Sequence, residues 1–179
     1  HYFVTAAGGE IAALDSGAMP GWVRTGQVFP VLAAGETRDG SQPVCRFYGR
    51  PEAGLNSHFY SASPAECAAV QAQFGQAWQL EASEVFRAYL PNAATGACAT
   101  GQVPIYRSFN NRSDANHRYT ASASVQAAML RSGFVAEGYG VPPVIFCGPG
   151  ADAPAVPVCT LASSANTPAI GTTVQITAA

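Results

Sequence analysis

The chain has 179 residues, of which 48% are hydrophobic and 11% are charged, and its formal net charge is −2. This composition is typical of a globular protein, and it lacks the basic surplus with which proteins bind a nucleic-acid backbone. No apolar run approaches the roughly 18 residues that a membrane-spanning helix needs. We therefore expect neither a nucleic-acid partner nor insertion into a membrane.

A histidine followed by aromatic or hydroxyl residues occurs three times, in residues 1–5, 58–62 and 117–121. A large aromatic residue follows each of these segments at a similar distance: Trp22, Trp78 and Phe134. Self-similarity at a fixed period indicates one supersecondary unit used three times. We place the three repeats at about residues 1–42, 43–102 and 103–149.

The middle repeat shows the elements of the unit in chain order. Residues 43–48 predict a short strand, residues 49–57 a polar turn, and the segment from His58 a second strand of a hairpin. A helix follows, because the sequence at 63–66 combines an N-cap serine, a proline and a glutamate in the pattern of a capping box. We expect Cys67, Val70 and Phe74 to lie on one face of that helix.

An extended, aromatic-rich segment then follows each helix, beginning at Trp22, Trp78 and Phe134. One unit therefore consists of strand, strand, short helix and strand. Such a unit has too little apolar surface to be stable alone, so three copies should close around a shared core. The predicted fold class is α+β, with approximate threefold internal symmetry.

The C-terminal region differs in composition from the repeats. Residues 150–157 are small and include prolines, which predicts an extended linker. Residues 158–179 resemble the opening two strands of a bacterial immunoglobulin-like domain, and two strands cannot fold alone. We expect this tail to be disordered or loosely docked, and both ends to continue into further domains of a longer polypeptide.

Five cysteines occur, without the close Cys-x-x-Cys pairs of a zinc site, at positions 45, 67, 98, 147 and 159. The four within the repeats predict a disulfide framework, which is typical of an oxidising compartment. Four cysteines allow three pairings, and the sequence does not choose between them. We favour Cys67 with Cys98 and Cys45 with Cys147, while four reduced thiols are the alternative.

The His-Phe-Tyr segment at 58–60, the Ser-Pro-Ala-Glu helix start at 63–66 and the Trp-x-x-Glu segment at 78–81 resemble a known family. They are similar to short repeats of secreted bacterial and fungal proteins, catalogued as domain of unknown function 5648. The resemblance spans about residues 1–149, although the first repeat has Thr25 where the others have Glu81 and Glu137. It implies a secreted or cell-surface accessory module, often attached to hydrolases, with no known ligand or cofactor.

Two groups of residues could support chemistry. The three histidines could form a metal or proton-transfer site, but their repetition favours a structural role. Glu81 and Glu137 could act as the carboxylate pair of a glycoside hydrolase, yet we favour ion pairs with Arg46 and Arg107. No nucleophile motif occurs. The sequence therefore predicts neither an enzyme nor a metal or cofactor site.

Binding to a sugar is the function that the residue types favour. Aromatic, Asn and Arg side chains contact sugar rings without needing net charge, and polar turns precede the histidines. We predict these ligand-binding residues in and beside the turns: Asn56, His58, Tyr60, Arg112, Asn116, His117 and Tyr119. The expected protein is a non-enzymatic extracellular module that binds cell-wall or other glycan. The alternative is a structural or protein-contact spacer that supports a neighbouring hydrolase domain.

Overall fold

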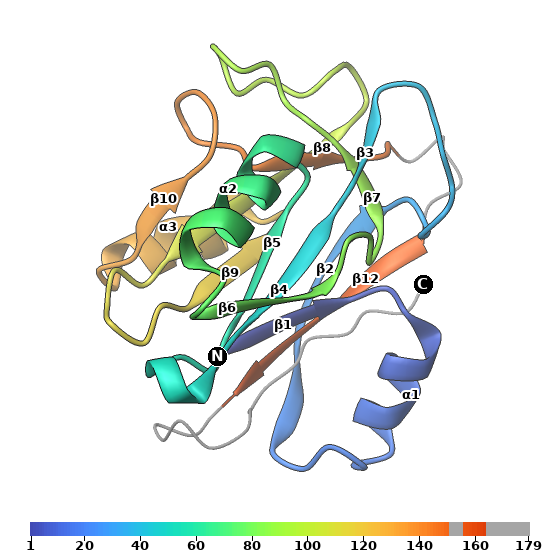
Figure 1. Cartoon of the computed structure of the whole chain (residues 1–179). Helices are drawn as coiled ribbons and strands as arrows, with labels where there is room; N and C mark the ends of the chain where they lie inside the picture. The colour runs from blue at the N-terminus through green and yellow to red at the C-terminus, as the bar shows by residue number, and fades with distance from the viewer. Residues whose placement is uncertain (151–155, 164–179) are drawn as a thin grey trace.

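A computed structural model describes residues 1–150 and 156–163 of the chain. Its α-helices lie against antiparallel β-sheets (Figure 1), which confirms the α+β fold class. The helices and strands are described below sheet by sheet, because the order of strands within each sheet positions the candidate site.

The middle segment, residues 43–102, contains a three-stranded sheet with β4 (Cys45–Gly49) at its centre. The neighbours of β4 are β5 (His58–Ser61) and β6 (Trp78–Ala82). A 3₁₀ turn, η1 (Pro51–Ala53), lies between β4 and β5, and helix α2 (Pro64–Phe74) connects β5 to β6. The order strand, strand, helix, strand is the one that the sequence predicts as far as β6. The predicted strand does not continue unbroken from Trp78 to Leu90, because residues 87–89 form a separate strand in another sheet.

The third segment, residues 103–149, adds to a larger sheet. Strand β8 (Val103–Phe109) pairs with β9 (His117–Thr120) and with β10 (Val135–Glu137), and α3 (Ala123–Arg131) connects these two neighbours. The sheet continues through β11, β7 and β3, which span Phe146–Gly148, Arg87–Tyr89 and Ser41–Pro43. The middle and third segments are thus joined by backbone pairing.

The first segment, residues 1–42, contributes β1 (Tyr2–Thr5), α1 (Gly8–Asp15) and β2 (Trp22–Val31). Strand β12 (Val156–Ser163) lies between β1 and β2 and pairs antiparallel with both (Figure 1). The expectation that the tail is loosely docked is therefore wrong for residues 158–163, because their backbone is the centre of a sheet. The last two residues of the predicted linker, 156 and 157, belong to the same strand. The remainder of the expected immunoglobulin-like segment, 164–179, lies outside the described residues.

One hydrophobic core joins the three segments. Its buried members come from each of them, and they are Val4, Phe29, Val31, Val44, Tyr60, Ala62, Phe86, Ala88, Ile105, Tyr119, Ile145 and Phe146. Burial of apolar surface is the main stabilising contribution in a domain of this size. The shared core explains why no segment needs to fold alone.

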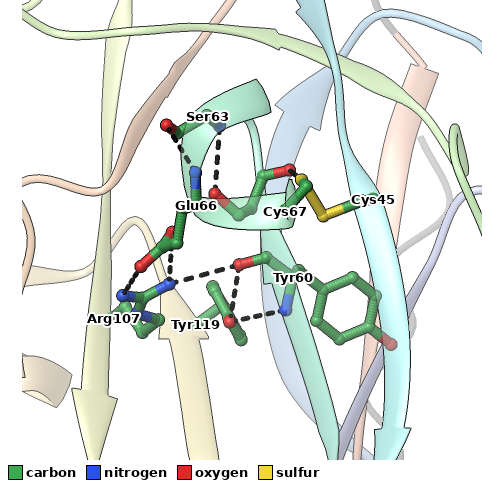
Figure 2. The surroundings of a disulfide bond; sticks show 8 residues. Cys45, Tyr60, Ser63, Glu66, Cys67, Arg107 and Tyr119 are labelled. Carbon is green, nitrogen blue, oxygen red and sulfur yellow. Dashed lines mark hydrogen bonds and ion pairs between the residues drawn. A yellow bond between two sulfur atoms is a disulfide. The ribbon is translucent and has the colours of Figure 1, made fainter. Parts of the chain in front are cut away.

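The start of α2 forms one of the two hydrogen bonds of the predicted capping box. The Ser63 side chain accepts a hydrogen bond from the Glu66 backbone N–H at 3.2 Å, which confirms the predicted N-cap. The reciprocal half of the capping box is replaced, because the Ser63 backbone N–H donates to Ser61 Oγ at 3.0 Å. The Glu66 carboxylate is thereby left to pair with Arg107 (Figure 2).

The same hydroxyl–amide hydrogen bond occurs in all three segments. Thr5 and Thr120 accept hydrogen bonds at 3.0 Å from the backbone amides two residues later, as Ser61 does. The residue three positions before each hydroxyl is Tyr2, His58 and His117, respectively. The alignment of His1 with the other two histidines is therefore wrong by one residue, because the hydrogen bonds place Tyr2 there.

The disulfides join the predicted four cysteines, but the favoured pairing is wrong. Cys45 bonds to Cys67, with 6.3 Å between the Cα atoms, and Cys98 bonds to Cys147, with 5.8 Å. Cys45 lies opposite Ser61 in the β4–β5 ladder, and α2 begins just after Ser61. The first turn of α2 therefore brings Cys67 over β4 (Figure 2), at a distance from Cys45 that a disulfide spans.

Two buried tyrosine hydroxyls connect neighbouring segments through the backbone. Tyr60 accepts a hydrogen bond from the Val4 N–H at 2.9 Å. Tyr119 accepts one from the Tyr60 N–H at 2.8 Å and donates to the Tyr60 carbonyl oxygen at 2.9 Å (Figure 2). Each hydroxyl therefore satisfies polar groups that would otherwise be buried without a partner.

We expect Tyr119→Phe to lower the free energy of unfolding by about 1–3 kcal/mol, because it leaves the Tyr60 amide and carbonyl buried without that partner. Denaturant unfolding followed by circular dichroism measures the change. Tyr89→Phe is the matched control, since the Tyr89 hydroxyl makes no hydrogen bond to another described residue. Equal stabilities of the two variants would contradict this account of the tyrosine contacts.

Candidate functional site

The residues predicted to bind a ligand do not form one surface. Five of them are buried: Asn56, Tyr60, Asn116, His117 and Tyr119. The turn asparagines face other residues of the protein: Asn56 accepts a hydrogen bond from the Tyr48 hydroxyl, and Asn116 accepts one from Ser57 Oγ. The rings of the two tyrosines are 0% and 2% exposed, so a sugar could stack on them only if the core opened.

The two remaining predicted residues have different surroundings. Arg112 is exposed and forms an ion pair with Asp114 at 2.9 Å. His58 is partly buried against the ring of Phe3, with 4.7 Å between the ring centroids. His58 and the buried His117 border hollows in the surface, and these hollows form the candidate site.

The first aromatic hollow lies between the first and middle segments and has a volume of about 170 Å³. Its lining includes Phe3, Leu14, Trp22 and His58. The Phe3 and Trp22 rings pack edge to face at 5.8 Å, so each presents part of its surface to the hollow. The exposed side chain of Met19 stands at the rim.

The second aromatic hollow lies between the middle and third segments and has a volume of about 200 Å³. Its lining includes Phe59, Val70, Trp78 and His117. Phe59 and Trp78 pack edge to face at 6.1 Å, and Phe59 lies 5.2 Å from the His117 ring. Phe74, which is 54% exposed, lines this hollow as well.

The two hollows are built in the same way. In both, an aromatic from one segment packs on the tryptophan that begins the strand after the helix of that segment, and the next segment adds a histidine. A helix contributes the apolar residue, Leu14 from α1 or Val70 from α2. The corresponding aromatic position of the third segment holds Arg118, whose guanidinium lies 4.9 Å from the centre of the Tyr2 ring.

A partly buried ion-pair network supports the first hollow. Arg46 Nε lies 2.8 Å from Glu81 Oε2, which confirms the predicted Arg46–Glu81 pair. Arg46 Nη2 also lies 2.8 Å from Glu10 Oε1 on α1. The arginine therefore connects a strand of its own segment to the helix of the preceding one.

Arg107 repeats this arrangement beside the second hollow. Its Nε lies 2.8 Å from Glu137 Oε2, as predicted, and its Nη2 lies 2.7 Å from Glu66 Oε1 on α2 (Figure 2). The Arg107 guanidinium also lies 4.7 Å from the centre of the Phe59 ring, within the range of a cation–π contact. Sequence reasoning missed Glu10 and Glu66 as partners, although both occupy the first turn of a helix.

The carboxylates of these networks differ in their pKa values. Burial alone would raise the pKa of Glu81, but a hydrogen bond from His58, together with the charge and hydrogen bond of Arg46, outweighs it and lowers that pKa. Burial would also raise the pKa of Glu66, but the hydrogen bond and charge of Arg107 outweigh burial, and the pKa of Glu66 is lowered. For Glu137 burial prevails over the attraction of Arg107, and its pKa is raised.

Both histidines of the hollows are held in their neutral form. Burial and, to a smaller extent, the neighbouring Arg107 charge lower the pKa of His117 to about 3. Burial lowers the pKa of His58 as well, although Glu81 opposes the change. A neutral imidazole keeps one N–H donor and one acceptor nitrogen. Nε2 of His58 lies 3.3 Å from Glu81 Oε2, and Nε2 of His117 lies 3.5 Å from Glu137 Oε2.

Sequence reasoning singled out Trp22 and Trp78 as markers of the repeat but assigned them only to strands. The signal that could have found the hollows is a tryptophan kept at the same offset after the helix, where the next two residues of the strand are exposed in both segments. Within residues 1–150 and 156–163, no group of three or more His, Cys, Asp or Glu side chains is placed to hold a metal ion. In the same ranges, no helix has the length and apolar content to cross a bilayer.

Comparison with family models assigns residues 1–142 to "Domain of unknown function (DUF5648)". The match covers most of the chain, so the protein belongs to this family. No curated protein and no solved structure matches the chain.

We expect the protein to lose stability as the pH falls from 6.5 towards 4.5. The histidines of the unfolded chain bind protons near pH 6.5, whereas His117 of the folded chain does so only near pH 3. Each such histidine lowers the free energy of unfolding by about 1.4 kcal/mol per pH unit below its unfolded pKa. Chemical denaturation at several pH values measures the slope.

The variant His117→Gln should flatten this slope, whatever its effect on stability at pH 7. Measurements are kept above pH 4.5 because Glu66 and Glu81, whose pKa values are lowered, change the free energy of unfolding mainly at lower pH. An unchanged slope in the variant would show that His117 binds its proton in the folded state.

Proposed function

We propose that the protein is a non-catalytic, extracellular accessory module that binds cell-wall or other glycan through the two aromatic hollows. The observation that supports this most is the recurrence of one arrangement, an edge-packed aromatic pair beside a neutral histidine, in both hollows. Aromatic faces contact the C–H groups of sugars, and the imidazole can hydrogen-bond a hydroxyl.

The size of the hollows supports a polymer rather than a cofactor as the ligand. Volumes of about 170 and 200 Å³ lie below the roughly 300–1,000 Å³ of sites that enclose drug-sized molecules. Each hollow therefore suits a single sugar of a chain. Two weak sites on one module bind a polymer more tightly than either site alone, because the second contact is intramolecular.

The two hollows also support the proposal that the three segments are repeats arranged with approximate threefold symmetry. The aromatic hollows and the arginine networks recur at successive boundaries between segments, and the hydroxyl–amide hydrogen bonds recur in all three. The shared core contains residues from each segment.

The electrostatics support a binding role over a catalytic one. Glu81 and Glu137, the only carboxylates that the sequence suggested for glycoside hydrolysis, are each engaged by an arginine. Acid–base catalysis needs a carboxyl group that is free to exchange a proton with its substrate. The two disulfides support secretion, because such bonds persist in oxidising compartments.

A structural spacer is the second candidate function. The observation that favours it is the burial of most of the repeated residues, including Tyr60 and Tyr119, which serve the core rather than a surface. A spacer needs stable segments but no ligand. The two candidates differ in whether the hollows bind anything.

Retention on insoluble peptidoglycan, chitin and cellulose tests the proposal. Phe74→Ala and Met19→Ala each remove a side chain from one hollow, and we expect each to weaken retention about 2–10-fold. The double variant should lose most of it, because the two sites act together. Both side chains are about half exposed, so the fold should tolerate their loss.

Leu130→Ala is the matched control, since Leu130 is an exposed apolar residue of α3 that lies outside both hollows. Retention that both hollow variants leave unchanged would refute the assignment of the site. No retention of the native chain on any polysaccharide would favour the spacer, and turnover of any of them would refute the non-catalytic role.

A further inference from the structure

Strand β12 holds the same place in its sheet as β4 holds in the sheet of the middle segment. The strand order is β1–β12–β2 in one sheet and β5–β4–β6 in the other, with all pairs antiparallel. The two central strands differ in chain order. Strand β4 precedes both of its neighbours, whereas β12 follows both of its own.

The register of the pairing gives the equivalence residue by residue. In the middle segment, Cys45 lies opposite Ser61. In the first, Cys159 lies opposite Thr5. Ser61 and Thr5 are themselves equivalent, because each hydroxyl accepts the backbone amide two residues later. Cys159 therefore occupies the backbone position of Cys45.

The sequence supports this equivalence independently. Residues 157–159 read Pro-Val-Cys, and so do residues 43–45. The alignment by sequence and the alignment by strand register place the same two cysteines together. Agreement between two unrelated observations argues against a chance pairing of the tail with an open sheet edge.

We propose that the space between β1 and β2 is a strand-binding site, and that residues 156–163 of the same chain are its occupant. These residues are the leading strand of the first segment, carried at the other end of the chain. The module then extends to residue 163, beyond the family match, and β12 belongs to it rather than to a following immunoglobulin-like domain.

The site needs an occupant for a physical reason. Without β12, β1 and β2 would each present an unpaired edge, which is a template for pairing with another chain. Core residues Val4, Phe29 and Val31 lie on these two strands and are at most 2% exposed. The chemistry that fits the site is an extended segment that pairs antiparallel on both sides, which is recognition by strand addition.

A disulfide tests the proposal in the full chain. Cys67 is the fourth residue after the N-cap Ser63, and Ile11 is the fourth after the N-cap Ala7. If β12 matches β4, Ile11→Cys places a thiol against Cys159 as Cys67 stands against Cys45. We expect a new bond within one chain, found by non-reducing peptide mapping and by titration of thiols.

Ala12→Cys is the matched control, because Ala12 is the next residue of α1 and is exposed. Its new thiol should remain reactive and form no bond to Cys159. An Ile11→Cys variant that folds but keeps both thiols reactive would overturn the register. A disulfide between two chains would overturn the choice of occupant and assign the site to a second copy.

Cleavage between β11 and β12 provides a test without a core substitution. A protease site in place of residues 151–155 allows the folded chain to be cut after purification. We expect the C-terminal piece to co-elute with the rest of the protein in native size-exclusion chromatography and to separate in denaturant. Release under native conditions would refute the strand-binding site.

Discussion

The structure depends on buried arginines that are each held between two carboxylates. The Arg107 side chain is only 5% exposed, and a buried charge of this kind is tolerated only when it is paired and hydrogen-bonded. Its partners, Glu66 and Glu137, come from different segments, so satisfying the charge also fixes how the segments meet. Arg46 imposes the same constraint on Glu10 and Glu81.

The candidate site follows from this constraint. Each arginine lies beside the aromatic residue of a hollow, Arg46 near Phe3 and Arg107 near Phe59, and thereby fixes the face that the ring presents. The arginine charge and burial together keep the imidazole of His117 neutral. The contacts that join the segments thus also shape the two hollows that we propose for sugar binding.

Charged residues are few, and several of them form the ion pairs between segments. Only 11% of the residues are charged, yet arginine–carboxylate pairs occur at both boundaries that form a hollow. Where the first segment has Thr25 in place of Glu81 and Glu137, the boundary to the third segment is made differently. There Thr120 donates a hydrogen bond to Gln27, and Arg118 lies over Tyr2.

The sequence by itself determined the elements of the middle segment, the N-cap at Ser63 and the pairing of Glu81 and Glu137 with strand arginines, because these follow from local patterns and fixed offsets. It also indicated which four cysteines form disulfides. Only the tertiary structure decided their pairing, the burial of Tyr60 and Tyr119, and the place of β12. These features depend on contacts between residues far apart in the chain, and a local pattern of residue types does not specify which distant partner each one meets.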